Sequence, residues 1–176
     1  MTIGINVAAA IKQPRTGVEE YVYQLIKHLT MLPEAREHRF LLYLSAKALA
    51  SAGARRAKAG VPNSPYPVKG RDPHGALRPN PLLREERENL FFDFPLPSNF
   101  EIKILRWPWP FLWTQVRLAW EMLRRPPEAL FIPAHILPLF SPLNSAVAIH
   151  GLEYEYFPKH YSLWRRLYLR WSTARG

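Results

Sequence analysis

Residues 2–44 read TIGINVAAAIKQPRTGVEEYVYQLIKHLTMLPEAREHRFLLYL. Apolar residues alternate over 2–8, and a turn that contains a proline and a glycine follows at 11–17. From Val18 onward the apolar residues recur with helical spacing, and a second apolar run occupies 39–44. A strand, a helix and another strand in this order predict a right-handed βαβ unit with a parallel sheet.

The start and the end of the predicted helix carry their own signals. Thr16 is expected to cap the N-terminus, and Glu19, three residues later, completes a capping-box pattern. Pro33 is expected to end the helix, because proline lacks the N–H group that would continue the backbone hydrogen bonds. A helix bounded in this way begins directly at Gly17.

The rest of the chain continues to alternate strands and helices. Apolar runs and helical spacing predict strands at 100–105, 129–132 and 145–149, and helices at 45–49, 110–123 and 164–171. Residues 54–81 are rich in Gly, Pro, Lys and Arg without periodicity, so 54–99 is expected to be a flexible insertion. We therefore predict a single domain over 1–176, of α/β class, with a Rossmann-like doubly wound parallel sheet.

Composition limits the classes of function. The 176 residues carry a formal net charge of +10 and contain no cysteine, which excludes disulfides and thiolate metal sites. No signal peptide and no apolar run of about 18 residues is recognisable, so a cytoplasmic protein is expected. The basic charge favours anionic lipid, phosphorylated small molecules or nucleic acid as partners, unless the rest of a longer chain compensates it.

The predicted topology locates a candidate site. Ligands of open parallel sheets bind beyond the carboxyl ends of the strands, and the segments 9–17, 133–137 and 150–153 leave predicted strands at that edge. Gly17 begins a helix, where unpaired N–H groups and the helix dipole favour an anion. His135 and His150 follow neighbouring strands, where an imidazole is suited to bind a sugar hydroxyl or a developing charge. No histidine and carboxylate set has metal-ligand spacing, so no metal site is expected.

Each of these features also has a purely structural interpretation. Gly17 is compatible with a glycine required by turn geometry, and either histidine with a polar loop residue. Glu153 and Glu155 are interpreted as solvated loop carboxylates rather than as a catalytic pair. The aromatic, arginine-bearing segments 106–113 and 164–171 fit either a membrane interface or core packing. Nucleic acid is not an expected partner, because no recognisable nucleic-acid motif is present.

Three short motifs lie at predicted strand exits. They are Ile3-Gly4-Ile5-Asn6 with Arg15-Thr16-Gly17-Val18-Glu19-Glu20-Tyr21, Leu130-Phe131-Ile132-Pro133-Ala134-His135 with Pro138, and Ala148-Ile149-His150-Gly151-Leu152 with Tyr156-Phe157-Pro158. In this order they resemble the N-terminal domain of family 4 glycosyltransferases, also called glycosyl transferases group 1. The resemblance covers both ends of the chain and leaves about 54–99 unmatched.

The resemblance implies a GT-B architecture, in which two Rossmann-like domains face each other across a cleft. This chain would be the acceptor-binding half of a retaining enzyme that transfers a hexose from a nucleotide-sugar to a glycan or lipid-linked acceptor. A C-terminal domain would bind most of the donor, so the present chain is expected to be inactive alone. No metal or other cofactor is implied, since positive side chains and helix N-termini stabilise the departing diphosphate in this family.

The same resemblance implies roles for particular residues. His150 would contact the transferred sugar as the catalytic residue, and Thr16 and Gly17 would form the loop that approaches the donor phosphates and sugar. His135 and Arg15 would lie on the acceptor side. Peripheral contact with the inner face of the membrane is a further expectation.

The chain departs from the family pattern in three places. The loop at Gly17 has one glycine where many members have two, Glu20 stands where arginine is frequent, and Gly151 stands where aspartate is common. Two other interpretations stay open beside a glycosyltransferase half. They are a non-catalytic α/β binding module and a basic membrane-surface or RNA-binding protein.

Overall fold

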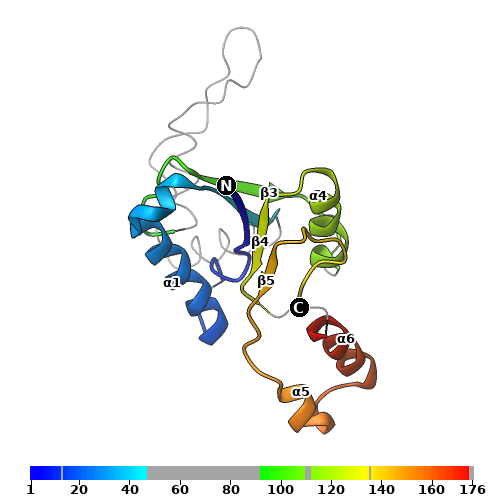
Figure 1. Ribbon diagram of the computed structural model, residues 1–176. Coiled ribbons are helices and arrows are strands. Elements are labelled where there is room, and N and C mark those ends of the chain that lie inside the picture. The colour runs from blue at the N-terminus through cyan, green and yellow to red at the C-terminus, as the bar shows by residue number, and fades with distance from the viewer. Residues whose placement is uncertain (13, 47–91, 110–111, 135, 175–176) are drawn as a thin grey trace, which may run out of the picture.

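Five parallel strands form the centre of the computed structural model, which describes residues 1–12, 14–46, 92–109, 112–134 and 136–174 (Figure 1). The strands are β1 (Thr2–Asn6), β2 (Arg39–Ser45), β3 (Phe100–Leu105), β4 (Ala129–Ile132) and β5 (Ser145–Val147). Their order across the sheet is β3-β2-β1-β4-β5, and every neighbouring pair is parallel. The predicted α/β class and parallel sheet are confirmed, and the strand order is compatible with a Rossmann-like fold.

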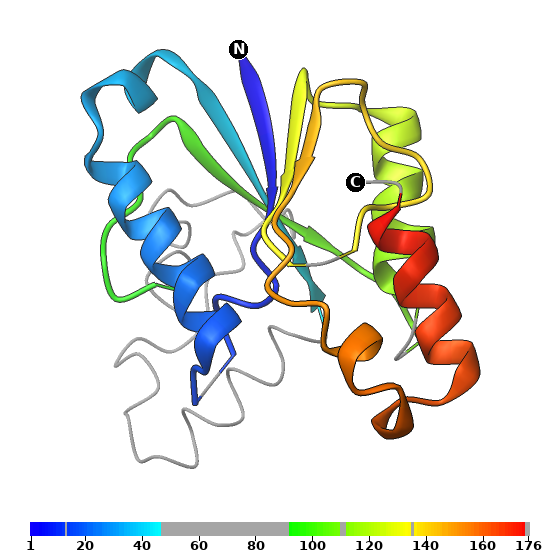
Figure 2. The same ribbon diagram turned by 60° about the horizontal axis from the view of Figure 1, so that its bottom comes forward.

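Helices lie on both faces of the sheet. They are α1 (Gly17–Met31), η1 (Pro33–Glu37), the π-helix η2 (Trp113–Leu118), α4 (Ala119–Arg124), α5 (Glu153–Tyr156), η3 (Pro158–His160) and α6 (Leu163–Thr173). Figure 2 shows α1 on one side of the sheet, and α4 with α6 on the other. The sheet is therefore the middle one of three layers, which explains why its central strands are apolar on both faces.

Strand β2 illustrates this two-sided burial. Leu42 and Leu44 are fully buried and belong to the cluster on the α1 side of the sheet. Leu41 and Tyr43 point the other way, into the cluster that contains residues of η2, α4 and β4. Because successive side chains of a strand alternate between faces, both faces of β2 must be apolar, which accounts for its continuous hydrophobic run.

Helix α1 packs on the sheet through one stripe of its surface. Val22 and Ile26, four residues apart, are both fully buried in the cluster beneath it. At the start of the helix, the N–H and the hydroxyl of Thr16 both donate to Oε2 of Glu19, with the N–H bond at 3.2 Å. The helix ends at Met31, before Pro33, as the sequence predicts.

Gly4 in β1 is required by close packing. A Cβ atom at this position would lie 2.8 Å from Cε2 of Tyr43 and 2.9 Å from Cγ of Pro127. Neither neighbour has space to move away, because Tyr43 is fully buried in the core. The absence of a side chain at Gly4 therefore lets β1 lie between β2 and β4, at the centre of the sheet.

The structure differs from the sequence-based expectations in several segments. Phe92, within the predicted insertion 54–99, is 1% exposed and packs in the core, and the Tyr23 hydroxyl donates to Asp93 beside it. Residues 47–91 lie outside the described residues, and with them most of the helix expected at 45–49. The helix expected at 110–123 is described from Trp113 and begins as a π-helix.

The prediction that Glu153 and Glu155 lie in a loop is wrong, whereas Glu153 is exposed to solvent as predicted. Both lie in the short helix α5, and Glu155 forms ion pairs with Arg170 and Arg166 of α6. The Arg170 guanidinium lowers the pKa of the Glu155 carboxyl below its usual value. Glu155 thus holds α5 against α6. The spacing of these residues in the sequence does not predict this contact.

Candidate functional site

The strand order reverses direction next to β1, which marks the carboxyl edge of the sheet there as a candidate binding site. From β1 the chain crosses to β2 and β3 on one side, whereas β4 and β5 lie on the other side of β1. The order therefore reverses between β1 and β4, and ligands of open α/β sheets bind at such a reversal. Three segments leave the sheet there: 7–16 after β1, the segment that starts at Pro133 after β4, and 148–152 after β5.

His150, in the segment after β5, contacts both the end of β4 and helix α1. Its side chain is exposed, and its Nε2 lies 2.6 Å from the carbonyl oxygen of Pro133, at the end of β4. Because the carbonyl only accepts, Nε2–H is the donor of this hydrogen bond. On its other side, the His150 ring packs edge-on against Tyr21 of α1, with ring centroids 4.9 Å apart. The exits of β4 and β5 and the first turns of α1 are therefore in contact.

Thr16 and Gly17 lie at the N-terminal end of α1. Both residues are exposed, at the N-terminus of the 15-residue helix α1. A Cβ atom added at Gly17 would meet no other heavy atom within 4 Å, and its φ angle is not in the left-handed region. Neither packing nor turn geometry therefore requires glycine here, in contrast to Gly4. A molecule that approaches this helix end reaches the backbone directly.

The charges around this helix end are largely paired. Nζ of Lys12 lies 2.7 Å from Oε1 of Glu19, whose residue is 9% exposed. The Lys12 ammonium, followed by the Thr16 hydroxyl, lowers the pKa of Glu19 to about 2, so this carboxyl is ionised at neutral pH. At this helix end Lys12 is therefore already engaged with a carboxylate.

Arg15 is held against the side of α1. Its guanidinium lies 3.4 Å from the ring centroid of Tyr23 and 3.8 Å from a carboxylate oxygen of Glu20. Glu20, one of the three departures from the family pattern, thus pairs with a cation inside the candidate site. The arrangement fixes the direction of the Arg15 side chain next to the helix end.

The structure brings together most of the residues that the sequence singled out. Arg15, Thr16 and Gly17 lie at one helix end, and His150 contacts the same helix through Tyr21. His135 lies outside the described residues. Sequence reasoning missed Tyr21 as part of the site, although its position one turn after Gly17 is a signal that could have found it.

It also missed the carbonyl of Pro133, which holds His150 and which no side-chain pattern reveals. No group of three or more histidine, aspartate or glutamate side chains suited to a metal ion occurs within the described ranges. In the same part of the chain, no helix combines the length and the apolar character needed to cross a bilayer. Comparisons with protein-family models, curated proteins and solved structures found no match for this chain.

Proposed function

We propose that this chain is the acceptor-binding half of a retaining glycosyltransferase of GT-B architecture, which transfers a hexose from a nucleotide-sugar to a glycan or lipid-linked acceptor. The observation that carries the proposal is the position of His150 at the carboxyl edge of the sheet. There its ring contacts Tyr21 of α1 and donates to the Pro133 carbonyl across the exits of two strands. The motif resemblance supports the proposal, because its three motifs contribute to this one edge.

The proposed roles follow from where each residue lies at the carboxyl edge of the sheet. The open backbone at Thr16 and Gly17 would receive the donor phosphates and sugar, because the helix N-terminus offers N–H donors and no side chain blocks it. His150, oriented by Pro133, would contact the transferred sugar. Arg15 would contribute to the acceptor side, as would His135.

A second Rossmann-like domain is part of this proposal. The basic and polar groups that stabilise the departing diphosphate would come from that domain, because Lys12 and Arg15 already lie against carboxylates here. We expect no metal or other cofactor in the reaction and no transfer by the 176-residue chain alone. We place the enzyme in the cytoplasm, at the inner face of the membrane.

The test is hexose transfer by the complete gene product that contains this chain. UDP-glucose and GDP-mannose serve as probe donors, and lipid and glycan extracts as acceptors, with the anomeric configuration of the product read by NMR. His150→Ala should lower turnover by roughly 100-fold, the typical cost of removing one oriented group at a reacting centre. His160→Ala removes an exposed histidine of η3 and is the matched control.

The outcomes separate the competing interpretations. Transfer with retained configuration that depends on His150 but not on His160 supports the proposal. Full activity in His150→Ala, with folding verified by circular dichroism, removes that residue from its proposed role. The absence of transfer from either probe donor favours the alternative, a non-catalytic α/β binding module.

A further inference from the structure

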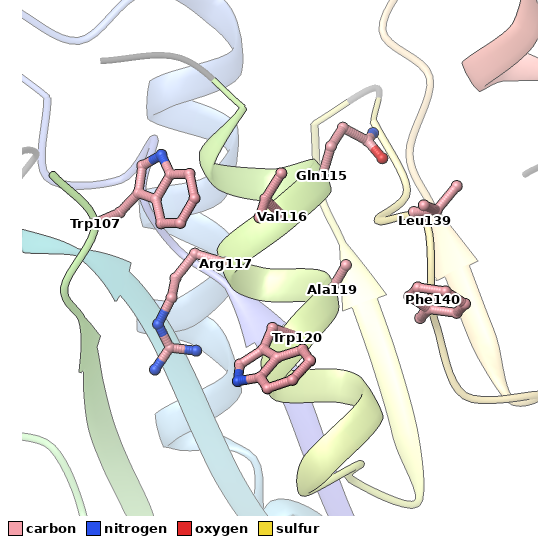
Figure 3. Close-up of a pocket in the computed structure, with 8 residues that line it drawn as sticks. All are labelled: Trp107, Gln115, Val116, Arg117, Ala119, Trp120, Leu139 and Phe140. Atoms are coloured by element: carbon pink, nitrogen blue, oxygen red, sulfur yellow. The ribbon is translucent and has the colours of Figure 1, made fainter. Parts of the chain in front are cut away.

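An apolar groove lies on the face of the sheet opposite α1. Its volume is about 470 Å³, and Figure 3 shows the side chains that form it. Trp107 comes from the loop after β3, Val116 and Trp120 from the continuous helix η2–α4, and Leu139 and Phe140 from the loop between β4 and β5. We call this surface the tryptophan face.

The tryptophan face is open to solvent. Trp120 is 50% exposed and Phe140 is 51% exposed. Trp109, which is 58% exposed, packs edge-on against Trp107 and extends the surface beyond the groove. Large aromatic side chains exposed together are uncommon on a protein surface, and such clusters mark places where another molecule or a membrane binds.

The backbone beside the groove is unusual as well. Leu112 has φ of 60°, the left-handed conformation that a leucine adopts at an energetic cost. It begins the π-helix Trp113–Leu118, a rare form that occurs frequently at functional sites. Within this helix Val116 is 42% exposed, whereas Leu118 is fully buried.

Basic residues accompany these aromatic side chains. Residues 103–125 contain five basic side chains and one acidic side chain, a net charge of +4. The Arg124 guanidinium lies 4.8 Å from the Trp120 ring, and Arg106 and Arg125 are exposed. Arg117 lines the groove and pairs with Glu121 at 3.0 Å. Arginines next to exposed tryptophans complement a surface that is apolar beneath a layer of negative charge.

We propose that the tryptophan face docks on an anionic lipid bilayer. Trp107, Trp120 and Phe140 enter the headgroup layer, where amphipathic rings are favoured, and Arg106, Arg124 and Arg125 contact the lipid phosphates. Protein interfaces are also enriched in Trp, Phe and Arg. A surface that binds a protein rather than a bilayer would leave the chain unbound to anionic vesicles.

A second exposed aromatic surface offers the competing location. On α6, Trp164 is 83% exposed and Leu167 is 56% exposed. Two of the three arginines of that helix, Arg166 and Arg170, pair with Glu155. Residues 153–173 have four basic and two acidic side chains, a net charge of +2, so the electrostatic attraction there is weaker.

The experiment measures sedimentation of the chain with vesicles. Vesicles of equimolar phosphatidylglycerol and phosphatidylcholine should bind the protein, and vesicles of phosphatidylcholine alone should bind it far less. Binding should weaken as salt rises, because screening shortens the reach of the charges. Arg124→Gln with Arg125→Gln should weaken binding by about 30-fold, since each basic residue near an anionic surface contributes about fivefold.

Matched variants decide which surface binds. Trp120→Ser with Phe140→Ser should reduce binding by at least about tenfold, because two exposed aromatic side chains no longer enter the membrane. Trp164→Ser, and Lys159→Gln with Arg165→Gln, make similar changes outside the tryptophan face and should have little effect. Circular dichroism verifies that each variant is folded.

Two results overturn the proposal. One is that the protein binds equally to vesicles with and without phosphatidylglycerol, or that it binds to neither. The other is a larger loss from the α6 variants than from those of the tryptophan face. Membrane binding is measured without any sugar donor, so its outcome is independent of whether the chain belongs to a glycosyltransferase.

Discussion

Replacing Glu19 with glutamine tests the network that fixes the start of α1. The Lys12 ammonium, and then the Thr16 hydroxyl, lower the pKa of Glu19 from 4.5 to about 2. A difference of this size is worth at most about 3 kcal/mol of folding free energy at neutral pH. Lys12 is 63% exposed, so solvent screens the pair, and we expect about 1–2 kcal/mol.

The pH dependence of this stabilisation follows from the lowered pKa of Glu19. A carboxyl whose pKa is lowered on folding stabilises the folded state above its unfolded value of 4.5. That contribution is lost as the pH falls from 4.5 towards 2, where Glu19 becomes protonated in the folded state as well. Glutamine carries no charge at any pH, so the difference between Glu19→Gln and wild type should be large at neutral pH and small in acid.

The assay is urea unfolding followed by circular dichroism, at about pH 7, 4 and 3. Glu34→Gln, which removes an exposed carboxylate in η1, is the control and should show no comparable trend. A stability difference between Glu19→Gln and wild type that stays constant across these pH values would refute the reasoning, because the carboxylate would then not be coupled to Lys12.

Three further substitutions test other parts of the structure. Gly4→Ala should lower the unfolding free energy by about 1–3 kcal/mol, because its Cβ would overlap Tyr43 and Pro127; a urea midpoint equal to that of wild type would contradict this. Tyr43→Phe should change stability by less than about 1 kcal/mol near pH 7, since the buried hydroxyl has no hydrogen-bond partner among the described residues. Burial raises the pKa of Tyr43 from 10.0 to about 12. Between these pH values the tyrosine ionises in the unfolded state first, so the wild type should lose stability. Tyr43→Phe should keep its stability over the same range, as measured by urea unfolding at alkaline pH. Gly17→Ala should fold with unchanged or slightly higher stability, because its Cβ lies in open space, and should reduce hexose transfer by the complete enzyme.

The arrangement of the sheet was predictable because its strands carry strong local patterns. The apolar run at 39–44 is buried on both faces, and the capping residues at Thr16 and the proline at Pro33 bound the first helix. Strand ends were less predictable: β1 ends at Asn6 and β5 at Val147, earlier than the apolar runs extend. Pairing with neighbouring strands, rather than hydrophobicity, determines where a strand stops.

The candidate site was predictable only in outline. Parallel topology alone indicated that the segments after β1, β4 and β5 meet at one edge. The contact between Tyr21 and His150 depends on how α1 lies across the sheet, which the helical spacing of its apolar residues does not specify. The π-helix at Trp113–Leu118 also has no recognised sequence signal, and Phe92 was assigned to an insertion because its neighbours are rich in turn-forming residues.

The imidazole of His150 is oriented by a main-chain carbonyl and not by another side chain. A carbonyl is present whatever amino acid occupies position 133, provided that the turn keeps its course. The orientation of the ring therefore does not depend on which side chains occupy the segment that follows β4. Substitutions in that segment can therefore leave the ring of His150 in contact with α1.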